Sequence, residues 1–401
     1  MSDVPYFVTL GEAREISQKT TIPTIVEMVG LDDCHGRILA QSLESKVNDP
    51  PFDNSAMDGF AMRYDDTIGG GKKLKIIGTI QASSQEMMPE IHPGQAVRIM
   101  TGAPMPKGAD SILQIELCEV QGENVILNQE SKKHFIRKMG ENLKCGDVAL
   151  KSGSILSPAK AGLCATMGYD SIPVVKKLKI AIISTGDELV QPGEKLGPGE
   201  IYESNSFGLA GLVKWLGHDP VRIQAVDDSL KELREILNRV SEDCDLILTS
   251  GGVSMGEWDL VRKIMEQEGD LHFWRVKIRP GSPPLFGLWN KVPIFGLPGN
   301  PVSSHTVFRM IVAPWIRKMT GALGPQELQI KAKLTTSVKA TADCLTLRRL
   351  SVEFTESGII AYQKVHQGSG NLASITTSDA LTLLPAGSTA EIGEIIDLLL
   401  L

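Results

Sequence analysis

The sequence predicts a multidomain α/β protein, and three observations point to this class. Short strand-like runs alternate with helical segments from residue 178 to about residue 320. A segment at 72–140, divided by glycine and proline, is mostly strand-like, and strand-like runs return after Pro325. Strand–helix alternation is typical of a mostly parallel sheet with helices on both faces, whereas strands alone indicate small sheets or barrels.

The first 176 residues predict a helical and extended linking unit with an insertion. Residues 8–45 are expected to be helical until Pro50-Pro51 end the segment, and a helix is expected at 159–167. The strands expected between these stretches lie at 73–79, 96–100 and 111–120, with a hairpin connection at 121–124. We therefore expect the mostly β segment to be inserted between two parts that pack together.

The alternation of strand-like and helical segments in the middle of the chain, at 177–326, predicts the α/β unit. Its expected strands lie at 178–183, 221–226 and 245–249. A helix from about Ser204 is expected to end at Gly217, because glycine favours the position after a helix C-terminus. The next helix follows Ser229, which has capping-box spacing to Glu232, and its apolar face is formed by Leu230, Leu233, Leu237 and Val240.

After Pro325 the pattern predicts a small β-barrel or sandwich. Its strands are expected at 328–338, 345–354, 359–365, 380–384 and 395–399. The whole chain then divides into four parts: the linking unit (1–52 plus 141–176), the inserted β unit (53–140), the α/β unit (177–326) and the C-terminal barrel (327–401).

Composition excludes several classes of protein. A net charge of −7 without a long basic run argues against nucleic-acid binding. No stretch approaches the ~20 apolar residues of a membrane span, and no secretory signal is apparent, so we expect a cytoplasmic protein without membrane contact. The six cysteines form no CxxC pair and the histidines show no ligand spacing, which predicts reduced thiols and no structural zinc.

Three glycine-containing turns each end an apolar run and lead toward an expected helix. They read ISTGDEL at 183–189, TSGGVS at 249–254 and FGLPGNP at 295–301. The carboxyl ends of parallel strands lie along one sheet edge, where ligands bind in a crevice. Glycine lets backbone N–H groups approach a ligand, and helix N-termini favour anions. The three turns together predict an anion-binding crevice.

The segment WRVKIRPG at 274–281 carries alternating cations. In a strand, alternate side chains share a face, so Arg275, Lys277 and Arg279 are expected in one row. Trp274, Val276 and Ile278 are expected to face the core. Arginine offers paired donors with fixed geometry for an oxyanion or a phosphate. A solvated strand face paired with surface acids is the alternative, and the neighbouring glycine turns favour the anion site.

Acidic residues gather near the same turns. They are Asp187, Glu188, Asp227, Asp228, Glu257 and Asp259. Mg²⁺ is commonly held by one or two carboxylates together with phosphate oxygens and water. Helix capping by Asp187 or Asp228 is the alternative, and for any one acid taken alone it is the better explanation.

Other turns have plain structural explanations. Asn300 followed by Pro301 predicts an N-cap and a proline at the first helical position, although Ser303 and the helix start offer donors to an oxyanion. The segment PFDNSAMDG at 51–59 predicts an ordered loop. No Walker A or GxSxG sequence is present, so a P-loop ATPase and a serine hydrolase are unsupported.

Seven segments together resemble the molybdopterin molybdenumtransferase family, which includes bacterial MoeA and the E domain of gephyrin. They are PFDNSAMDG (51–59), RIMTGAP (98–104), STGDEL (184–189), 201–205, SGGVSMGEWD (250–259), 273–281 and GLPGNPVS (296–303). The resemblance covers nearly the whole chain. It implies a molybdopterin-binding α/β unit, an elongated homodimer in which the linking unit takes part, and insertion of molybdate into adenylylated molybdopterin with loss of AMP, helped by Mg²⁺.

The resemblance also implies site residues. Those matched to activity are Asp58, Thr101, Glu188, Asp227 and Asp259, of which Glu188, Asp227 and Asp259 are expected to position Mg²⁺. Asp58 and Thr101 are expected to come from the partner subunit. Substrate- or molybdate-binding residues are expected at Arg137, Ser250, Gly251, Gly252, Arg275, Arg279, Pro298, Gly299, Asn300, Ser303, Arg349 and Ser369.

Four positions depart from the family pattern. Arg275 and Arg279 stand where lysine is common, and Ser282 stands where lysine is frequent. Arginine is larger than lysine and binds oxyanions through a forked guanidinium, so the geometry of the bound anion and the selectivity between molybdate and tungstate are expected to depend on these positions. Asn142 stands where aspartate is frequent, so a metal or acid role at this position lacks its charge.

Two other functions fit parts of the chain. A molybdopterin adenylyltransferase needs only the α/β unit, so the segments 1–177 and 327–401 argue against it. A non-catalytic, gephyrin-like scaffold would need a peptide groove, which no motif marks. Molybdopterin adenylyltransferase and molybdoenzyme maturation proteins are the implied partners.

Overall fold

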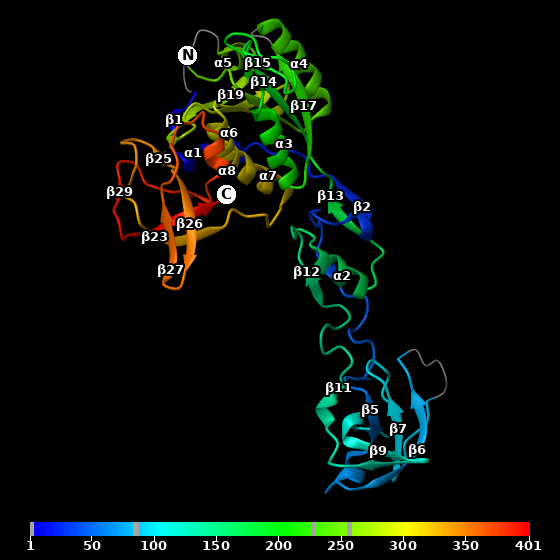
Figure 1. Ribbon diagram of the computed structural model, residues 1–401. Helices are drawn as coiled ribbons and strands as arrows, with labels where there is room; N and C mark the ends of the chain where they lie inside the picture. The colour runs from blue at the N-terminus through cyan, green and yellow to red at the C-terminus, as the bar shows by residue number, and fades with distance from the viewer. Residues whose placement is uncertain (1–3, 83–87, 227–228, 255–258) are drawn as a thin grey trace.

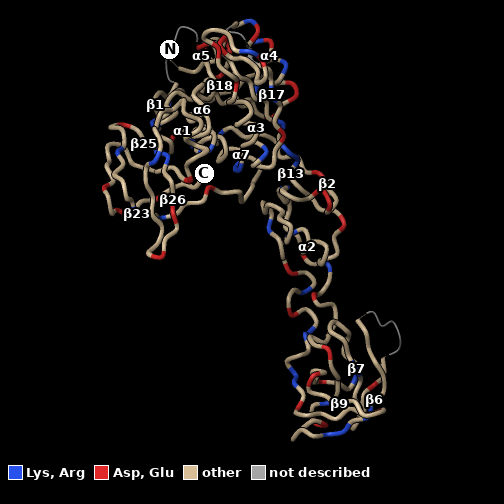
Figure 2. Tube along the Cα trace, in the orientation of Figure 1, with Lys and Arg blue, Asp and Glu red and all other residues tan. Residues whose placement is uncertain are grey.

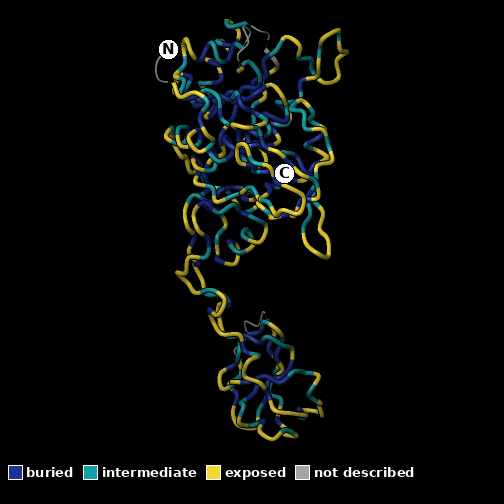
Figure 3. Tube along the Cα trace, turned by 90° about the vertical axis from the view of Figure 1, so that its left-hand side faces the viewer, coloured by how far each residue is buried: buried dark blue, intermediate teal, exposed yellow. Residues whose placement is uncertain are grey.

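The computed structural model describes residues 4–82, 88–226, 229–254 and 259–401. The chain forms a large body, which holds the main sheet and a barrel, and a small β domain at the end of a narrow arm (Figure 1). Buried positions gather in the large body and again in the small domain, whereas the outer part of the arm, at 47–52 and 138–148, is mostly exposed (Figure 3). Within the described ranges, no helix combines the length and the apolar character needed to cross a bilayer.

The main sheet of the large body has seven strands in the order β1-β19-β21-β22-β18-β14-β17. Their bounds are Tyr6–Val8, Asp270–Val276, Leu285–Trp289, Val292–Leu297, Leu246–Ser250, Lys179–Thr185 and Asp219–Val226. All pairings from β22 to β17 are parallel, and β21 runs antiparallel to both neighbours. The mostly parallel sheet is therefore confirmed, and the three glycine turns follow the adjacent strands β14, β18 and β22.

Helices cover both faces of this sheet, as predicted. On one face lie α1 (Leu10–Gln18), α3 (Asn205–Trp215), α6 (Pro301–Val307) and α7 (Ala313–Thr320), and on the other lie α4 (Leu230–Asp243) and α5 (Leu260–Gln267). Strand β14 shows why: Ile180 and Ile182 pack into the first core, whereas Ala181 and Ile183 pack into the second. Alternate side chains of a strand point to opposite faces, so a continuous apolar run supplies both cores.

The predicted helical stretch at 8–45 is wrong beyond Gln18. Helix α1 ends there, and β2 (Val26–Gly30) pairs antiparallel with β13 (Ser171–Val175). The β-branched residues Thr20, Thr21 and Ile22 disfavour a helix, and Pro23 cannot supply the N–H that a helix interior needs. The segment after the helix therefore pairs as a strand with the chain that returns from the small domain.

The arm consists of two passes of the chain. Pairing of β3 (Leu43–Glu44) with β12 (Val148–Leu150) joins them near α2 (Pro158–Thr166). Farther out, the N–H of Asp49 donates to the carbonyl of Leu143 at 2.8 Å, and the N–H of Leu143 donates back at 3.1 Å. The inserted segment therefore leaves the arm and returns to it at the same place.

The small domain is a six-stranded sheet in the order β8-β5-β7-β6-β10-β9. Its strands are β5 (Gly59–Met62), β6 (Lys73–Ile80), β7 (Gln95–Ile99), β8 (Ser111–Gln114), β9 (Cys118–Gln121) and β10 (Asn124–Leu127). The hairpin expected at 121–124 is confirmed, because Gln121 and Asn124 are paired across it.

The C-terminal strands close into a barrel, which confirms the predicted architecture. The barrel order is β23-β27-β26-β28-β30, with bounds Gln329–Leu334, Gly358–Tyr362, Arg349–Thr355, Ala380–Thr382 and Ile395–Leu400. Short β25 (Leu345–Thr346) leaves the barrel and pairs with β20 (Ile278–Arg279), so barrel and main sheet meet beside the cationic segment. The exact domain boundaries at 52, 140, 176 and 326 stay predictions.

His218, just before β17, makes the stability of this body depend on pH. Its side chain is 3% exposed, and its Nδ1 accepts a hydrogen bond from the N–H of Leu178 at 3.2 Å. Burial lowers the pKa of His218 to about 4 from an ordinary value of 6.5. Between these values the unfolded chain binds a proton that the folded chain excludes, so stability is full above pH 6.5 and falls as pH drops toward 4.

We expect the free energy of unfolding to fall by about 2 kcal/mol between pH 7.5 and pH 5 through this residue. Urea unfolding at both pH values measures the change. His218→Asn should flatten the pH dependence, whereas the variant of an exposed histidine, His92→Asn, should leave it as it is. An unchanged pH dependence in His218→Asn would contradict the assignment.

Candidate active site

A cavity of about 1030 Å³ lies at the carboxyl edge of the main sheet, against the barrel. All three glycine turns, the cationic segment and a loop of the barrel line it. The predicted site residues on its wall are Glu188, Ser250, Gly251, Gly252, Asp259, Arg275, Arg279, Pro298, Gly299, Asn300, Ser303 and Ser369. The fold thus brings together side chains that lie up to about 180 residues apart in the chain.

The first turn places the carboxylate of Glu188. Gly186 has φ 146°, and a Cβ at this position would lie 2.5 Å from Oε2 of Glu188. Any other residue would be strained at this φ and would displace the carboxylate from its place above the strand end. No helix follows directly: β15 (Leu189–Val190) pairs with β16 (Ile201–Tyr202), and the next helix begins at Asn205. Asp187 accordingly caps no helix, and that alternative is wrong.

The second turn packs its backbone against the first. Gly251 and Gly252 have φ 102° and 65°, and a Cβ on Gly251 would lie 2.7 Å from the carbonyl oxygen of Thr185. Asp259 precedes α5, yet its side chain does not cap that helix. Its carboxylate instead contributes to the cavity wall, which favours a ligand role over capping.

The third turn is docked to the barrel. Pro301 takes the first position of α6, as predicted, but Asn300 makes no side-chain capping bond. Nδ2 of Asn300 donates to Oγ of Ser369 at 3.0 Å, and the N–H of Val302 donates to the carbonyl of Ser369 at 3.1 Å. Asn300 therefore occupies the N-cap position of α6, as predicted, but its side chain bonds to the barrel loop instead of to the first turn of the helix.

Asn205 links the second and third turns, and sequence reasoning gave it no role. Its Nδ2 donates to Oγ of Ser250 at 2.8 Å and to the carbonyl of Gly299 at 2.6 Å. Its Oδ1 is buried and accepts no hydrogen bond from any described residue. The signal in the sequence was its position in the first turn of a helix at the carboxyl edge of the sheet.

Glu203 is a buried carboxylate on the same wall, and it too was missed. It is 2% exposed and accepts hydrogen bonds from Oγ of Ser184 at 2.9 Å and from the N–H of Ser206 at 2.7 Å. Nη2 of Arg222 lies 3.7 Å from its Oε2. A buried charge is tolerated only when it is paired and hydrogen-bonded, so Glu203 fixes the start of α3 against the end of β14.

The cations do not form the single row that was expected. Arg275 has φ 67°, which ends the regular alternation of β19. Arg275 and Arg279 line the cavity, whereas Lys277 does not, although the guanidinium of Arg275 and Nζ of Lys277 lie 5.5 and 5.6 Å from the centre of the same Phe7 ring. Val276 is fully buried, as predicted. The cavity is therefore lined by two arginines of this segment, Arg275 and Arg279.

Arg349 lies behind the cavity wall. It is 1% exposed, and its Nη2 donates to the carbonyls of His366 and Gly368 at 3.3 and 3.2 Å. Burial lowers the pKa of its guanidinium, and nearby Arg348 adds to this. Arg349 thus holds the loop that carries Ser369, and Arg348 lines the cavity in its place.

Asp58, Thr101 and Arg137 form a second cluster, in the small domain at the far end of the arm (Figure 1). Oδ1 of Asp58 accepts from the N–H of Thr101 at 2.6 Å and from its Oγ1 at 2.8 Å. These bonds lower the pKa of the exposed Asp58 carboxyl. Arg137 pairs with Asn54 nearby. Within one chain, the structure does not bring this cluster to the cavity.

The departures from the family pattern have local explanations. Nδ2 of Asn142 donates to Oδ2 of Asp49 at 3.2 Å in the arm, where an aspartate would set two carboxylates side by side. Ser282 is buried and donates to the carbonyl of Val276 at 3.1 Å, so its hydroxyl is used by the fold. Neither position supplies a charge to the cavity.

Part of the predicted magnesium site can be placed. Glu188 and Asp259 share the cavity wall, whereas Asp227, Asp228 and Glu257 lie outside the described residues. Within the described ranges no group of three His, Cys, Asp or Glu side chains forms a metal site. Mg²⁺ is usually held by only one or two carboxylates, with phosphate oxygens and water completing its shell, so the two carboxylates fit it.

Family models match the chain in three consecutive blocks. They are described as the MoeA N-terminal region (domains I and II) over residues 8–168, a probable molybdopterin binding domain over 181–318, and the MoeA C-terminal region (domain IV) over 331–401. The three blocks follow one another in order and cover most of the sequence.

Individual relatives agree over nearly the full length. A molybdopterin molybdenumtransferase of Haemophilus influenzae is 34% identical over 384 residues, 94% of each chain. Molybdopterin molybdenumtransferase 2 of Mycobacterium tuberculosis is 36% identical over 346 residues, 83% of this chain and 85% of the relative. The crystal structure of the molybdopterin biosynthesis MoeA protein of Pyrococcus horikoshii superposes with a TM-score of 0.84 at 29% identity, covering 98% of this chain and all of that one.

Proposed function

This chain belongs to the molybdopterin molybdenumtransferase family of molybdenum cofactor biosynthesis, and from this premise we propose that it joins molybdate to adenylylated molybdopterin with release of AMP. One observation carries the proposal. Three arginines, three carboxylates and three glycine turns line a single cavity of about 1030 Å³. The substrates need cations for an oxyanion, backbone donors for a phosphoanhydride and oxygen ligands for a divalent metal.

Arg275 and Arg279 are the residues for molybdate. Their planar guanidinium groups offer pairs of donors that match two oxygens of an oxyanion. Nη1 of Arg275 donates to the hydroxyl of Tyr6 at 3.0 Å, which holds the side chain in place. The barrel loop with Ser369 also lines the cavity.

Glu188 and Asp259 are the carboxylates that would hold Mg²⁺ beside the phosphates of the pterin nucleotide. Mg²⁺ bound there would screen and polarise the phosphoanhydride. The glycine turns bring backbone groups close to the same phosphates, and Asn205 keeps two of these turns in register. These groups would orient the phosphoanhydride for cleavage, and Mg²⁺ would balance the negative charge of the departing AMP.

A direct assay tests the proposed reaction. Purified protein is incubated with adenylylated molybdopterin, molybdate and Mg²⁺, and AMP is measured by chromatography. We expect AMP release that requires molybdate, together with cofactor that activates an apo-molybdoenzyme. AMP release without molybdate, or ATP consumption with unmodified molybdopterin, would instead indicate the adenylyltransferase alternative.

The variant Asn205→Ala tests whether Asn205 holds the second and third glycine turns in place. Loss of its two hydrogen bonds should lower kcat/KM for AMP release about ten- to hundredfold, because each bond contributes about 1 kcal/mol and the turns then move apart. Asn128→Ala, an exposed asparagine of the small domain, is the matched control. If both variants keep full kcat/KM, the positioning role of Asn205 is wrong.

We also propose that the enzyme works as a homodimer in which Asp58 and Thr101 of the partner subunit complete the cavity. The elongated arm keeps these residues away from the cavity of their own chain (Figure 1). Exposed apolar side chains near the base of the arm favour burial against a second copy; they include Ile25, Val26, Met28 and Leu323.

The cell compartment and partners follow from the reaction. Six free cysteines, with Cys145 exposed, suit the reducing cytoplasm. The substrate is a reactive adenylylated pterin, so a molybdopterin adenylyltransferase is the proposed donor and molybdoenzyme maturation proteins are the proposed acceptors.

A further inference from the structure

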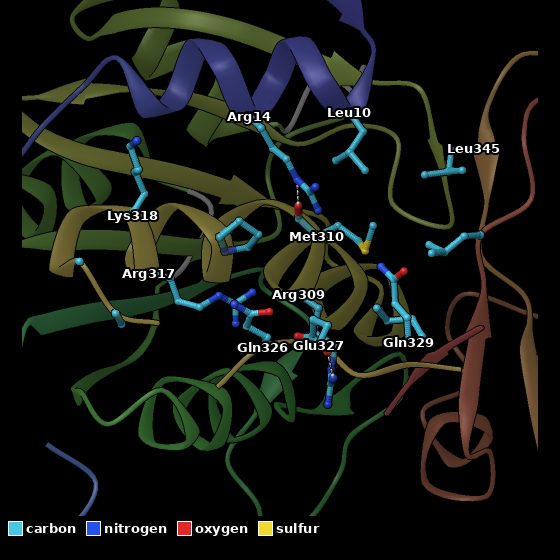
Figure 4. A pocket seen from close by; sticks show the side chains of 15 residues that line it. Leu10, Arg14, Arg309, Met310, Arg317, Lys318, Gln326, Glu327, Gln329 and Leu345 are labelled. Atoms are coloured by element: carbon cyan, nitrogen blue, oxygen red, sulfur yellow. Dashed lines mark hydrogen bonds and ion pairs between the residues drawn. The ribbon is translucent and has the colours of Figure 1, made fainter. Parts of the chain in front are cut away.

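A second cavity, of about 820 Å³, lies where α1, α7 and the barrel meet (Figure 4). We call it the basic pocket and define it by Arg14, Arg309, Arg317, Lys318 and Glu327. Among the described residues, none lines both this pocket and the candidate active site. The cofactor chemistry therefore does not explain it.

Positive charge dominates the basic pocket, in a chain whose net charge is −7. Lys and Arg positions gather around α7 in Figure 2. Nη1 of Arg309 pairs with Oε2 of Glu327 at 2.6 Å. In the described part of the chain, Arg14, Arg317 and Lys318 form no ion pair. These three cations line the pocket without a carboxylate at ion-pair distance, and the charge of Glu327 acts on Arg317 from farther away.

The two arginines are held in place by backbone groups. Nε of Arg14 donates to the carbonyl of Met310 at 2.7 Å, and Nη1 of Arg317 donates to the carbonyl of Pro325. Each guanidinium has five donors, so several remain for a ligand. Burial lowers the pKa of both groups, and Arg317 adds to the shift at Arg14 by repulsion. An anion between them would relieve both the repulsion and the lost hydration.

The pocket has a polar and an apolar side. Figure 4 shows Arg14 reaching from α1 toward the middle, with Lys318 and Arg317 on one side and Leu10 and Leu345 on the other. Within the described residues, no aromatic side chain belongs to the lining, so the pocket offers a nucleobase no stacking surface. Its volume is in the usual range for small-molecule sites.

We propose that the basic pocket binds a small organic phosphate, with the phosphate between Arg14 and Arg317, the exposed Lys318 at the rim, and the apolar body against Leu10 and Leu345. Three cations call for more than the single charge of a monocarboxylate, and arginine forks match phosphate oxygens. This binding is a property beyond the proposed transferase reaction and does not depend on it.

Calorimetric titration with phenyl phosphate and inorganic phosphate tests the proposal. We expect phenyl phosphate to bind more tightly, because only it reaches the apolar side. Arg14→Gln should raise its Kd about tenfold through loss of a charge-assisted hydrogen bond. Lys318→Gln, at an exposed position that does not support the fold, should raise it about threefold. Lys151→Gln, an exposed lysine of the arm, is the matched control and should change nothing.

Further variants distinguish phosphate binding in the basic pocket from binding at the candidate active site and from contact with a second copy of the chain. Arg279→Gln weakens anion binding at the candidate active site and should leave phenyl phosphate binding intact; loss of binding in this variant overturns the proposal. Equal Kd values for wild type, Arg14→Gln and Lys318→Gln overturn it as well. If no phosphate binds and Arg14→Gln turns a dimer into a monomer in sedimentation, the pocket belongs to a second copy of the chain and the proposal is wrong.

Discussion

Asp259→Asn is expected to lower molybdate-dependent AMP release by about a hundredfold or more. The substitution keeps the size of the side chain and removes the negative charge that would hold Mg²⁺ beside the anhydride. A metal that stabilises the transition state by about 3 kcal/mol accounts for a factor of about a hundred. Asp259 does not cap α5, so its loss should leave the helix and the fold intact.

The measurement is the initial rate of AMP release at several Mg²⁺ concentrations. Asp32→Asn, an exposed aspartate away from the cavity, is the matched control and should keep the wild-type rate. An Asp259→Asn enzyme with an unchanged rate and unchanged Mg²⁺ dependence would remove this carboxylate from the reaction.

Mixing two inactive variants is expected to restore activity if the site is shared between chains. Asp58→Ala should inactivate the cavity of the partner, and Asp259→Asn should inactivate the cavity of its own chain. In a mixed dimer, one cavity contains both native residues. After random exchange half of the dimers are mixed, so about a quarter of the wild-type activity should return.

The experiment compares each pure variant with an equimolar mixture that has been dissociated and reassociated. Two Asp58→Ala chains mixed with each other provide the control. No recovery in the mixture, together with proven mixed dimers, would place Asp58 outside the shared site. Full activity of Asp58→Ala alone would show that this carboxylate is dispensable.

Local patterns in the sequence were sufficient for most of the fold. The apolar run of β14 and the spaced leucines of α4 each contain enough information to define an element and the face that it buries. The stretch after Gln18 was misjudged because its partner, Ser171–Val175, lies about 145 residues away. Strand pairing over such a separation is decided by tertiary contacts that no local window contains.

The site was predicted in outline, since turns at adjacent strand ends meet whatever their sequence separation. Its details depended on single backbone angles and long-range contacts. The φ of 67° at Arg275 ended the expected row of cations. Asn300 bonds to Ser369 rather than to its own helix, and Asn205 joins two turns that lie about 50 residues apart. Such contacts need the barrel and the sheet to be in place first.

The two passes of the arm have a consequence for how this enzyme can evolve. Because Asp49 and Leu143 are hydrogen-bonded neighbours, residues 50–142 form a removable module on a stalk. Lengthening or shortening the stalk by matched steps in both passes would change the reach of Asp58 without touching any residue of the cavity. In the proposed homodimer, the length of the arm would therefore set the alignment between the chains without any change to the residues that carry out the reaction.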